Sequence, residues 1–466
     1  MLQLLKNIKF NQFWLFTILV VLLLMFPSLV QKGMFLDGVT YATISNNLAN
    51  GFGSFFDLHY TKVLMSHFKE HPPLVFWIQS FFFKVFGNHF WVEKIFSFLN
   101  FILTGFGMLL LFNFFFERKK YNWFPILLFI ITPLIFWCYN NNILENTLTV
   151  FVVFSGYFQL KYLKTNKIHF LIFASFFIIG AFLAKGFVGL FPLITPIIYL
   201  SAVDKNYKKY LLTNFLLIVI TLLTSVLILY VFPDLKVSLK EYFNTQLIPA
   251  LKGKREITTQ NRFKILFDLV FELTLPIVIF LAVYFTSKIK ELLFKKEALF
   301  FILVGLSGSL PLIISLKQRK FYLAPTFPFF IVGLSLLILP FIIAKFDVFY
   351  KNKKKVLQGI NLVLAMVLLV LILNFDGYFR DKDKIQDIEK IAFQVERGSI
   401  MSSTKSLTKD WGTVAYLSRI NYLSVTNKLE HHYFIKPKKE KISDEVAKSY
   451  TKLDLGLVKF DLYKRK

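Results

Sequence analysis

Long apolar runs separated by short polar segments dominate the chain from about residue 13 to residue 375. Most of the runs have about the length that an α-helix needs to cross the hydrocarbon core of a bilayer. The pattern therefore predicts an all-α polytopic membrane protein. The expected spans are 13–31, 91–116, 123–139, 146–160, 169–184, 187–203, 210–232, 263–287, 298–316, 321–344 and 356–375.

A shorter apolar run, 72–87, decides which loops share a side of the membrane. Short cytoplasmic loops are enriched in Lys and Arg. The basic clusters, together with Lys6 and Lys9, fall on the cytoplasmic side only if this run does not cross. The run contains Gln79 and begins with two prolines, which suit a helix start. We predict a juxtamembrane helix on the external face and eleven spans. The clusters are Arg118, Lys119 and Lys120; Lys161, Lys164 and Lys167; Lys205, Lys208 and Lys209; Lys288, Lys290, Lys295 and Lys296; and Lys345, Lys351, Lys353, Lys354 and Lys355.

The apolar stretch 169–203 is too long to be one span. As a single helix it measures about 52 Å, well beyond the hydrocarbon core. Lys185-Gly186 interrupts it near the middle. We predict two short spans with an external turn at these two residues.

The pattern changes after residue 375, so the chain divides into a transmembrane domain, 1–375, with a first external loop, 32–90, and a C-terminal domain, 376–466. Charged and apolar residues mix in the C-terminal part. The segments "YLSRINYLSV" and "LGLVKFDLYK" favour strands, whereas "DKIQDIEKIAFQVERG" favours a helix. The prediction is a small extracytoplasmic α/β domain.

Composition agrees with a membrane protein. The 466 residues are 56% hydrophobic with a mean hydropathy of +0.57. The net charge of +27 comes from 55 Lys and Arg against 28 Asp and Glu. Because the basic residues lie mostly in short loops, they indicate orientation and contact with membrane lipids rather than a nucleic-acid partner. Cys138 is the only cysteine, so no internal disulfide can form.

The predicted topology places carboxylates and cations from several loops on one membrane face. That combination suits a general base and a phosphate leaving group held by cations. The membrane interiors are almost free of charge, which disfavours an ion-coupled transporter. The external candidates are Asp37, Asp57, His59, His67, Glu70 and His71 in the first loop, Glu145 in the second, Lys185 in the third, and Lys317, Arg319 and Lys320 in the fifth.

The ordered motifs over about 30–340 resemble the membrane glycosyltransferases of the GT-C fold. The nearest groups are the bacterial aminoarabinose transferases and the protein O-mannosyltransferase relatives. The segments that carry the resemblance are "FLDGVTYATISNNLANGFG", "FKEHPPLVFWIQSFFFKVFG", "WVEKIFSFLN", "NNNILENTLTVFVVF", "LAKGFVGLFPL" and "KQRKFYLAPTFP". The chain departs from many relatives in having Gly38 after Asp37, where a second acid is common, and Glu145 where Asp is commoner.

The resemblance implies transfer of a sugar from a polyprenyl-phosphate donor to a lipid, glycan or protein acceptor, at the outer face of the inner (plasma) membrane. By carry-over, Asp37 is the general base, and Glu70 and Glu145 are the other catalytic acids. The donor phosphate is expected to bind Lys185, Arg319 and Lys320, with Tyr41 and Tyr322 as further substrate contacts. The activated sugar arrives on its lipid, so no nucleotide-binding loop is needed.

Several alternatives stay open at this stage. Asp37 could be a helix N-cap, and Glu70, Glu145, Lys185, Arg319 and Lys320 could be ordinary solvated or interfacial charges. Asp268 and Glu272, one turn apart, are expected to line a hydrated cavity. No cofactor is certain.

Three other functions are weighed against the transferase. The segment His67-Phe-Lys-Glu-His71 fits a metalloprotease pattern. Within a transferase, His67 and His71 are instead weak candidates for a divalent metal. A lipid or polysaccharide transporter (flippase) and a non-catalytic scaffold are the rivals from other classes.

Overall fold

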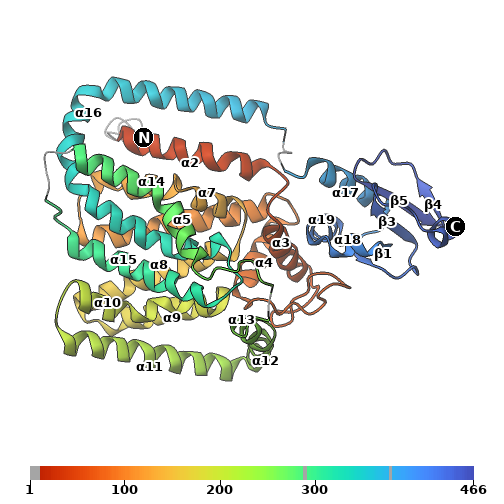
Figure 1. The fold of residues 1–466 in the computed structure, drawn as a ribbon, viewed down its shortest axis with the longest axis horizontal. Coiled ribbons are helices and arrows are strands. Elements are labelled where there is room, and N and C mark those ends of the chain that lie inside the picture. The colour runs from red at the N-terminus through yellow and green to blue at the C-terminus, as the bar shows by residue number, and fades with distance from the viewer. Residues whose placement is uncertain (1–10, 255, 287–290, 377–379) are drawn as a thin grey trace. The chain divides into compact units, whose positions relative to one another are not determined.

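The computed structural model describes residues 11–254, 256–286, 291–376 and 380–466, so Lys6, Lys9, Lys288 and Lys290 lie outside the described residues. The chain forms two compact units, and Figure 1 labels most of their helices and strands. Unit 1 comprises Met1–Pro27, Phe98–Tyr139 and Leu144–Asn374, and unit 2 comprises Ser28–Ser97, Asn140–Ile143 and Phe375–Lys466.

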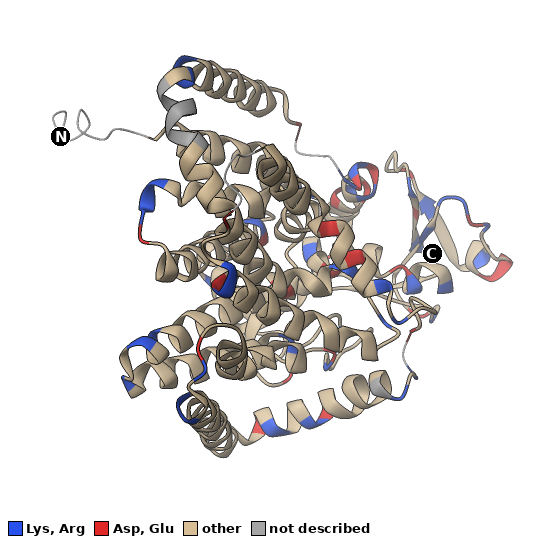
Figure 2. Cartoon of the chain, turned by 60° about the vertical axis from the view of Figure 1, so that its left-hand side comes forward, with Lys and Arg blue, Asp and Glu red and all other residues tan. Residues whose placement is uncertain are grey.

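Every regular element that the structure describes in unit 1 is a helix. Figure 2 shows long stretches of these helices without charged residues, as expected of membrane segments. The elements are α2 (Gln12–Val30), α5 (Val92–Phe115), η1 (Lys119–Tyr121), α6 (Trp123–Ile130), α7 (Pro133–Asn140), α8 (Leu144–Thr165), α9 (Ile168–Lys185), η2 (Gly186–Ile194), α10 (Thr195–Ala202), α11 (Tyr207–Val231), α12 (Pro233–Tyr242), η3 (Phe243–Leu247), α13 (Ile248–Leu251), α14 (Lys264–Thr286), α15 (Lys295–Ser309), η4 (Leu310–Ile314), η5 (Lys320–Thr326) and α16 (Phe327–Asn374).

Eight helices in the described ranges are long and apolar enough to cross a membrane, or nine if the pair α6–α7 forms one span. The chain is therefore a multi-pass membrane protein, but the expected eleven spans are not confirmed. The helix α8 has 22 residues yet is too polar to count, since it carries Glu145, Asn146 and Gln159. The turn η5 and the first part of α16 form one candidate span, Lys320–Ala344, and the end of α16 forms another, Asn352–Asn374. The helix α16 changes direction between them (Figure 1), and the backbone of Lys353, near the start of the second span, is not helical.

The stretch 168–202, which counts once among these candidates, is broken at the predicted turn. Gly186 has φ +81°, a conformation that favours glycine. Three residues later, a Cβ on Gly189 would lie 2.5 Å from the carbonyl of Ala181, so η2 packs closely against the end of α9. The chain therefore doubles back at Lys185-Gly186.

The predicted span 123–139 is instead bent by 78° between α6 and α7. Pro133 begins α7, and a proline has no amide hydrogen to continue the preceding helix. The carboxylate of Glu272 accepts a hydrogen bond from the amide of Leu134 at 3.1 Å. This contact satisfies one of the amides that the new helix start leaves open.

Unit 2 contains α3 (Leu36–Ala49) and α4 (Leu74–Phe86). The predicted juxtamembrane helix is α4, whose 13 residues make it about 20 Å long, too short to cross the hydrocarbon core. Phe81 and Val85 are exposed, at 65% and 56%, while Phe76 and Phe83 are buried. An apolar outer face on a short helix suits the membrane interface.

The C-terminal segment of unit 2 is α/β, as predicted. Its five-stranded sheet has the order β2-β1-β3-β5-β4, with β2, β1 and β3 parallel and β5 antiparallel to both β3 and β4. Ile385, Ile388 and Ile391 form the buried stripe of α17. The elements are α17 (Lys382–Gln394), β1 (Ile400–Ser403), α18 (Lys405–Lys409), α19 (Trp411–Asn421), β2 (Ser424–Thr426), β3 (Tyr433–Pro437), α20 (Asp444–Ser449), β4 (Tyr450–Leu453) and β5 (Phe460–Arg465).

One strand prediction in this segment was wrong. "YLSRIN" is the second half of α19, and only the last two residues of the predicted strand, Ser424 and Val425, are extended, in β2. The side chain of Asp410 caps α19 by accepting a hydrogen bond from the amide of Thr413 at 3.1 Å. The strand predicted in "LGLVKFDLYK" and the helix predicted at 383–398 correspond to β5 and α17.

Candidate functional site

Asp37 lies in the first turn of α3 and is partly buried. The N-cap is Phe35, so Asp37 is not the capping residue. Its carboxylate nevertheless lies at the positive end of the helix dipole, which favours the ionised form. An ionised carboxylate held by a helix start can accept a proton from a substrate.

The departure at Gly38 has a steric cause. A Cβ at this position would lie 1.9 Å from the backbone carbonyl oxygen of Asn141. The side chain of Asn141 also accepts a hydrogen bond from the amide of Phe35 at 2.8 Å, and Asn142 donates to the Gly38 carbonyl at 3.2 Å. The polar loop before Glu145 therefore packs directly on the start of α3, and a second acid after Asp37 would not fit.

Tyr41 and His71 meet in unit 2, where the Tyr41 hydroxyl lies 3.2 Å from Nε2 of His71. The Tyr41 ring also packs edge-on against Phe76 of α4, at 5.8 Å between centroids. Glu70, next to His71, is partly buried. The residues from His67 to His71 are not helical, so the helix that the metalloprotease pattern requires does not form.

His67, one of the two weak metal candidates, belongs to a group of possible ligands that does not include His71. Among the described residues, the ligand atoms of Asp57, His59 and His67 lie within 4.8 Å of one another. Burial raises the pKa of Asp57, but hydrogen bonds from His67, Lys69 and His59 outweigh it and lower that pKa overall. Asp57 therefore stays ionised between its basic neighbours.

In unit 1, Lys185 forms an ion pair with Glu145, and both side chains are nearly buried, at 9% and 1% exposure. The Lys185 ammonium also lies over the rings of Tyr322 and Phe321, at 4.6 and 5.5 Å from their centroids. Three predicted site residues, Glu145, Lys185 and Tyr322, are thus brought together by α8, the end of α9 and η5. The sequence motifs did not single out Phe321.

The turn that carries Lys185 packs under Tyr242, the last residue of α12. A Cβ on Gly186 would lie 2.2 Å from the Tyr242 hydroxyl, so only glycine leaves room for it. Tyr242 is 8% exposed. This residue, which the sequence motifs also missed, helps to hold the turn in place.

The other predicted phosphate-binding cations have different acidic partners. Lys320 lies 3.2 Å from Glu272 and 4.0 Å from Asp268, and Arg319 lies 3.5 Å from Glu256. Glu272 is 6% exposed and bonds both to Lys320 and to the amide of Leu134 in α7. Lys320 is nevertheless joined through η5 to Phe321 and Tyr322, which contact Lys185.

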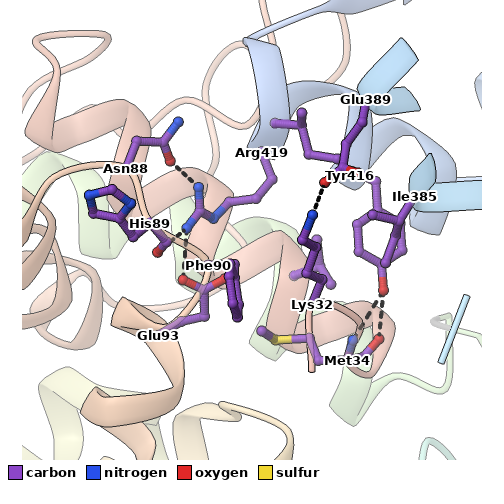
Figure 3. Close-up of a pocket in the computed structure, with 12 residues that line it drawn as sticks. Lys32, Met34, Asn88, His89, Phe90, Glu93, Ile385, Glu389, Tyr416 and Arg419 are labelled. Atoms are coloured by element: carbon purple, nitrogen blue, oxygen red, sulfur yellow. Dashed lines mark hydrogen bonds and ion pairs between the residues drawn. The ribbon is translucent and has the colours of Figure 1, made fainter. Parts of the chain in front are cut away.

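Unit 2 also contains a pocket of about 270 Å³ (Figure 3). On one side, Arg419 of α19 points toward Asn88, the carbonyl of His89 and Glu93. On the other, Lys32 and Glu389 form an ion pair of 2.5 Å. The charges that line the pocket are thus largely paired within the protein. The full lining is Lys32, Met34, Val39, Asn88, His89, Phe90, Glu93, Ile385, Glu389, Tyr416, Arg419 and Ile420.

Comparison with known proteins points to one fold. Residues 70–232 match the family described as dolichyl-phosphate-mannose-protein mannosyltransferase. The crystal structure of ArnT from Cupriavidus metallidurans bound to undecaprenyl phosphate is 14% identical, covers 96% of this chain and 97% of that one, and gives a TM-score of 0.65. The apo structure of the same protein gives a TM-score of 0.67 at the same identity and coverage. No curated protein sequence matches the chain.

The likeness to ArnT extends over nearly the whole of both chains, and at this identity it shows a shared fold. The predicted GT-C fold with a small C-terminal α/β part is therefore confirmed. The family match and the fold together support a GT-C glycosyltransferase.

Proposed function

We propose that the protein transfers a sugar from a polyprenyl-phosphate donor to an acceptor on the extracytoplasmic face of the inner (plasma) membrane. The observation that carries the proposal is the nearly buried Lys185 beside Glu145 and Tyr322, in a chain with the fold of ArnT. ArnT has been crystallised with undecaprenyl phosphate, a lipid of the proposed donor class.

The reaction is a displacement at the anomeric carbon of the sugar. The acceptor oxygen or nitrogen forms the new bond, the bond from the anomeric carbon to the phosphate oxygen breaks, and the configuration inverts. Asp37 takes the acceptor proton as general base. Glu70 and Tyr41 orient the acceptor or the sugar.

The leaving polyprenyl phosphate takes the bonding electrons and needs cations. Lys185 acts as a point charge on the phosphate, and Tyr322 holds the ammonium in place through its ring. In the resting protein Glu145 neutralises Lys185, and the phosphate competes for the same ammonium. Arg319 and Lys320 add two partly exposed cations, at 47% and 45% exposure, that suit phosphate oxygens.

The test supplies purified full-length protein with polyprenyl-phosphate sugars that carry a labelled sugar, together with lipid, glycan and peptide acceptors. Wild type is expected to move the label to one acceptor class and release polyprenyl phosphate. Asp37→Asn is expected to lose about 10²- to 10⁴-fold in turnover. Asp454→Asn, which changes an exposed carboxylate, is the matched control.

Two results would contradict the proposal. Unchanged turnover in Asp37→Asn removes this residue from the base role. In vesicles, movement of the labelled lipid across the membrane without cleavage of its sugar–phosphate bond identifies a transporter instead.

A further inference from the structure

The loop between α3 and α4 gathers two imidazoles around one carboxylate. Nδ1 of His67 lies 2.9 Å from one oxygen of Asp57, and Nε2 of His59 lies 3.1 Å from the other. The two imidazole rings lie 5.2 Å apart between centroids and are tilted by 56° to each other. The proposed transfer reaction assigns no role to Asp57, His59 or His67; its residues in this unit are Asp37, Glu70 and Tyr41.

The backbone of the loop sets this arrangement. Leu58 pairs with both Gly53 and Phe68 in antiparallel bridges, and the amide of Phe68 donates to the Leu58 carbonyl at 2.6 Å. Leu58 and Phe68 are 3% and 2% exposed, so both are anchored in the core. Asp57 and His59 flank the first anchor and His67 precedes the second. The three ligand-type side chains are therefore positioned by buried residues rather than by chance surface contacts.

Gly53 makes room for the group. Its φ is +95°, and a Cβ there would lie 2.7 Å from the Asp57 carbonyl oxygen and 2.8 Å from Cδ2 of His59. Phe52 packs its ring against His59 at 4.9 Å between centroids. The loop thus fixes the position of one imidazole from two sides.

We propose that Asp57, His59 and His67 bind a divalent transition-metal ion of the Zn²⁺ type, with a fourth position open to water. Two imidazoles and one carboxylate suit Zn²⁺, which binds nitrogen and oxygen at about 2.0 to 2.2 Å in tetrahedral sites. Ligand atoms already within 4.8 Å of one another need only small side-chain movements to surround one ion. The ion would tie together the loop that leads to Glu70 and His71.

Lys69 sets the strength of this site. Its ammonium lies 3.2 Å from Asp57 and donates to the carbonyl of Phe56 at 2.8 Å. In the metal-free protein this cation helps to neutralise the carboxylate, and it repels a second cation. Removing the charge of Lys69 should therefore strengthen metal binding.

The test measures binding of Zn²⁺ and Co²⁺ to metal-stripped full-length protein in detergent. It uses a competing chromophoric chelator for Zn²⁺ and the visible absorption of Co²⁺ for the coordination geometry. We expect one ion per chain, affinity at least about 10-fold weaker in His67→Ala, and tighter binding in Lys69→Met. His432→Ala removes another exposed imidazole and should bind as wild type does.

His67 is 68% exposed, so its replacement should leave the fold intact, which size-exclusion chromatography of each variant checks. Equal affinity in wild type and His67→Ala, or no stoichiometric binding by wild type, overturns the proposal. Neither readout uses a sugar donor. The metal site and the transferase function can therefore fail independently.

Discussion

Each unit contains a nearly buried cation–carboxylate pair, and the two pairs differ in what else surrounds the cation. In unit 2, Arg419 and Glu93 are 8% and 3% exposed. Arg419 also donates to Asn88 and to the His89 carbonyl, and it lies over the ring of Phe83 at 4.8 Å. In unit 1, Lys185 has Glu145 as its one hydrogen-bond acceptor among the described residues, and two aromatic rings complete its surroundings.

The difference separates a structural cation from a candidate binding cation. A buried ion pair offsets its desolvation only when further hydrogen bonds satisfy its remaining groups. The guanidinium of Arg419 makes several such bonds to protein atoms, so its main effect is on stability. An ammonium has three donors, and Lys185 uses one of them on Glu145, which leaves capacity for the oxygens of a phosphate.

The largest effect is expected from Arg419→Met. This change leaves Glu93 as a buried charge without its partner, which typically costs about 3 to 5 kcal/mol. The full-length protein in detergent should melt at a clearly lower temperature and show faster proteolysis in residues 375–466. Arg397→Met is the control, because Arg397 is exposed and lies over Tyr422 at 4.3 Å. An equal melting temperature in both variants would contradict a structural role for Arg419.

Lys185→Met should act on the reaction as well as on stability. It leaves Glu145 buried without its partner, so a lower melting temperature is expected together with a loss of turnover. Loss of one preorganised charge at a leaving group costs about 10²- to 10³-fold in turnover, or about 2.7 to 4 kcal/mol. The measurement is kcat/KM for the labelled donor, with the melting temperature recorded alongside. Lys164→Met removes a lysine that also lies over an aromatic ring, Phe114, and should keep wild-type turnover. If both variants are equally active, Lys185 is only an interfacial anchor.

Hydropathy predicted most of unit 1 because each membrane helix is a local apolar run. The short α4 and the reversal at Lys185-Gly186 followed from run length and a single glycine. The bend between α6 and α7 could not be predicted from the apolar run, although Pro133 is visible in it, because a proline inside such a run is compatible with a straight span. The bent form depends on Glu272, which is distant in the sequence and accepts a hydrogen bond from the freed amide of Leu134.

The site was predictable in kind but not in its pairings. Lys185 was chosen from its motif, yet its partners Glu145 and Tyr322 are far away in the sequence and only the fold brings them together. Arg419 was missed because the apolar and polar residues of "YLSRIN" follow a pattern typical of a strand, and because its partner Glu93 lies 326 residues away in the sequence. No local sequence pattern indicates that one compact unit contains both Ser28–Ser97 and Phe375–Lys466.

The turn that presents Lys185 can be tested through Gly186→Ala. With φ +81° and ψ −146°, this backbone conformation is almost restricted to glycine, and a side chain there costs about 1 to 3 kcal/mol. We expect a lower melting temperature together with reduced turnover, because the turn positions Lys185. Gly359→Ala, in α16 with open space around it, is the matched control.

A second variant identifies the source of that cost. The added Cβ would meet the Tyr242 hydroxyl, so Gly186→Ala combined with Tyr242→Phe should recover part of the loss. Recovery to wild type would assign the whole effect to this clash. No recovery would assign it to the backbone conformation.

The smallest effect is expected at a third buried pair, in the C-terminal sheet. Asp461 accepts hydrogen bonds from Lys436 at 2.7 Å and from Lys452 at 2.8 Å. Burial raises the pKa of Asp461, but these two lysines outweigh it and hold that pKa below its ordinary value of 3.8. A lowered pKa in the folded state means that the pair stabilises the protein above pH 3.8 and that this contribution, about 1 kcal/mol or less, is lost as the pH falls below that value. The melting temperature of wild type should therefore fall more steeply than that of Asp461→Asn between about pH 4.5 and pH 3. Parallel curves would show that the pair, although buried like the other two, contributes nothing that depends on the charge of Asp461.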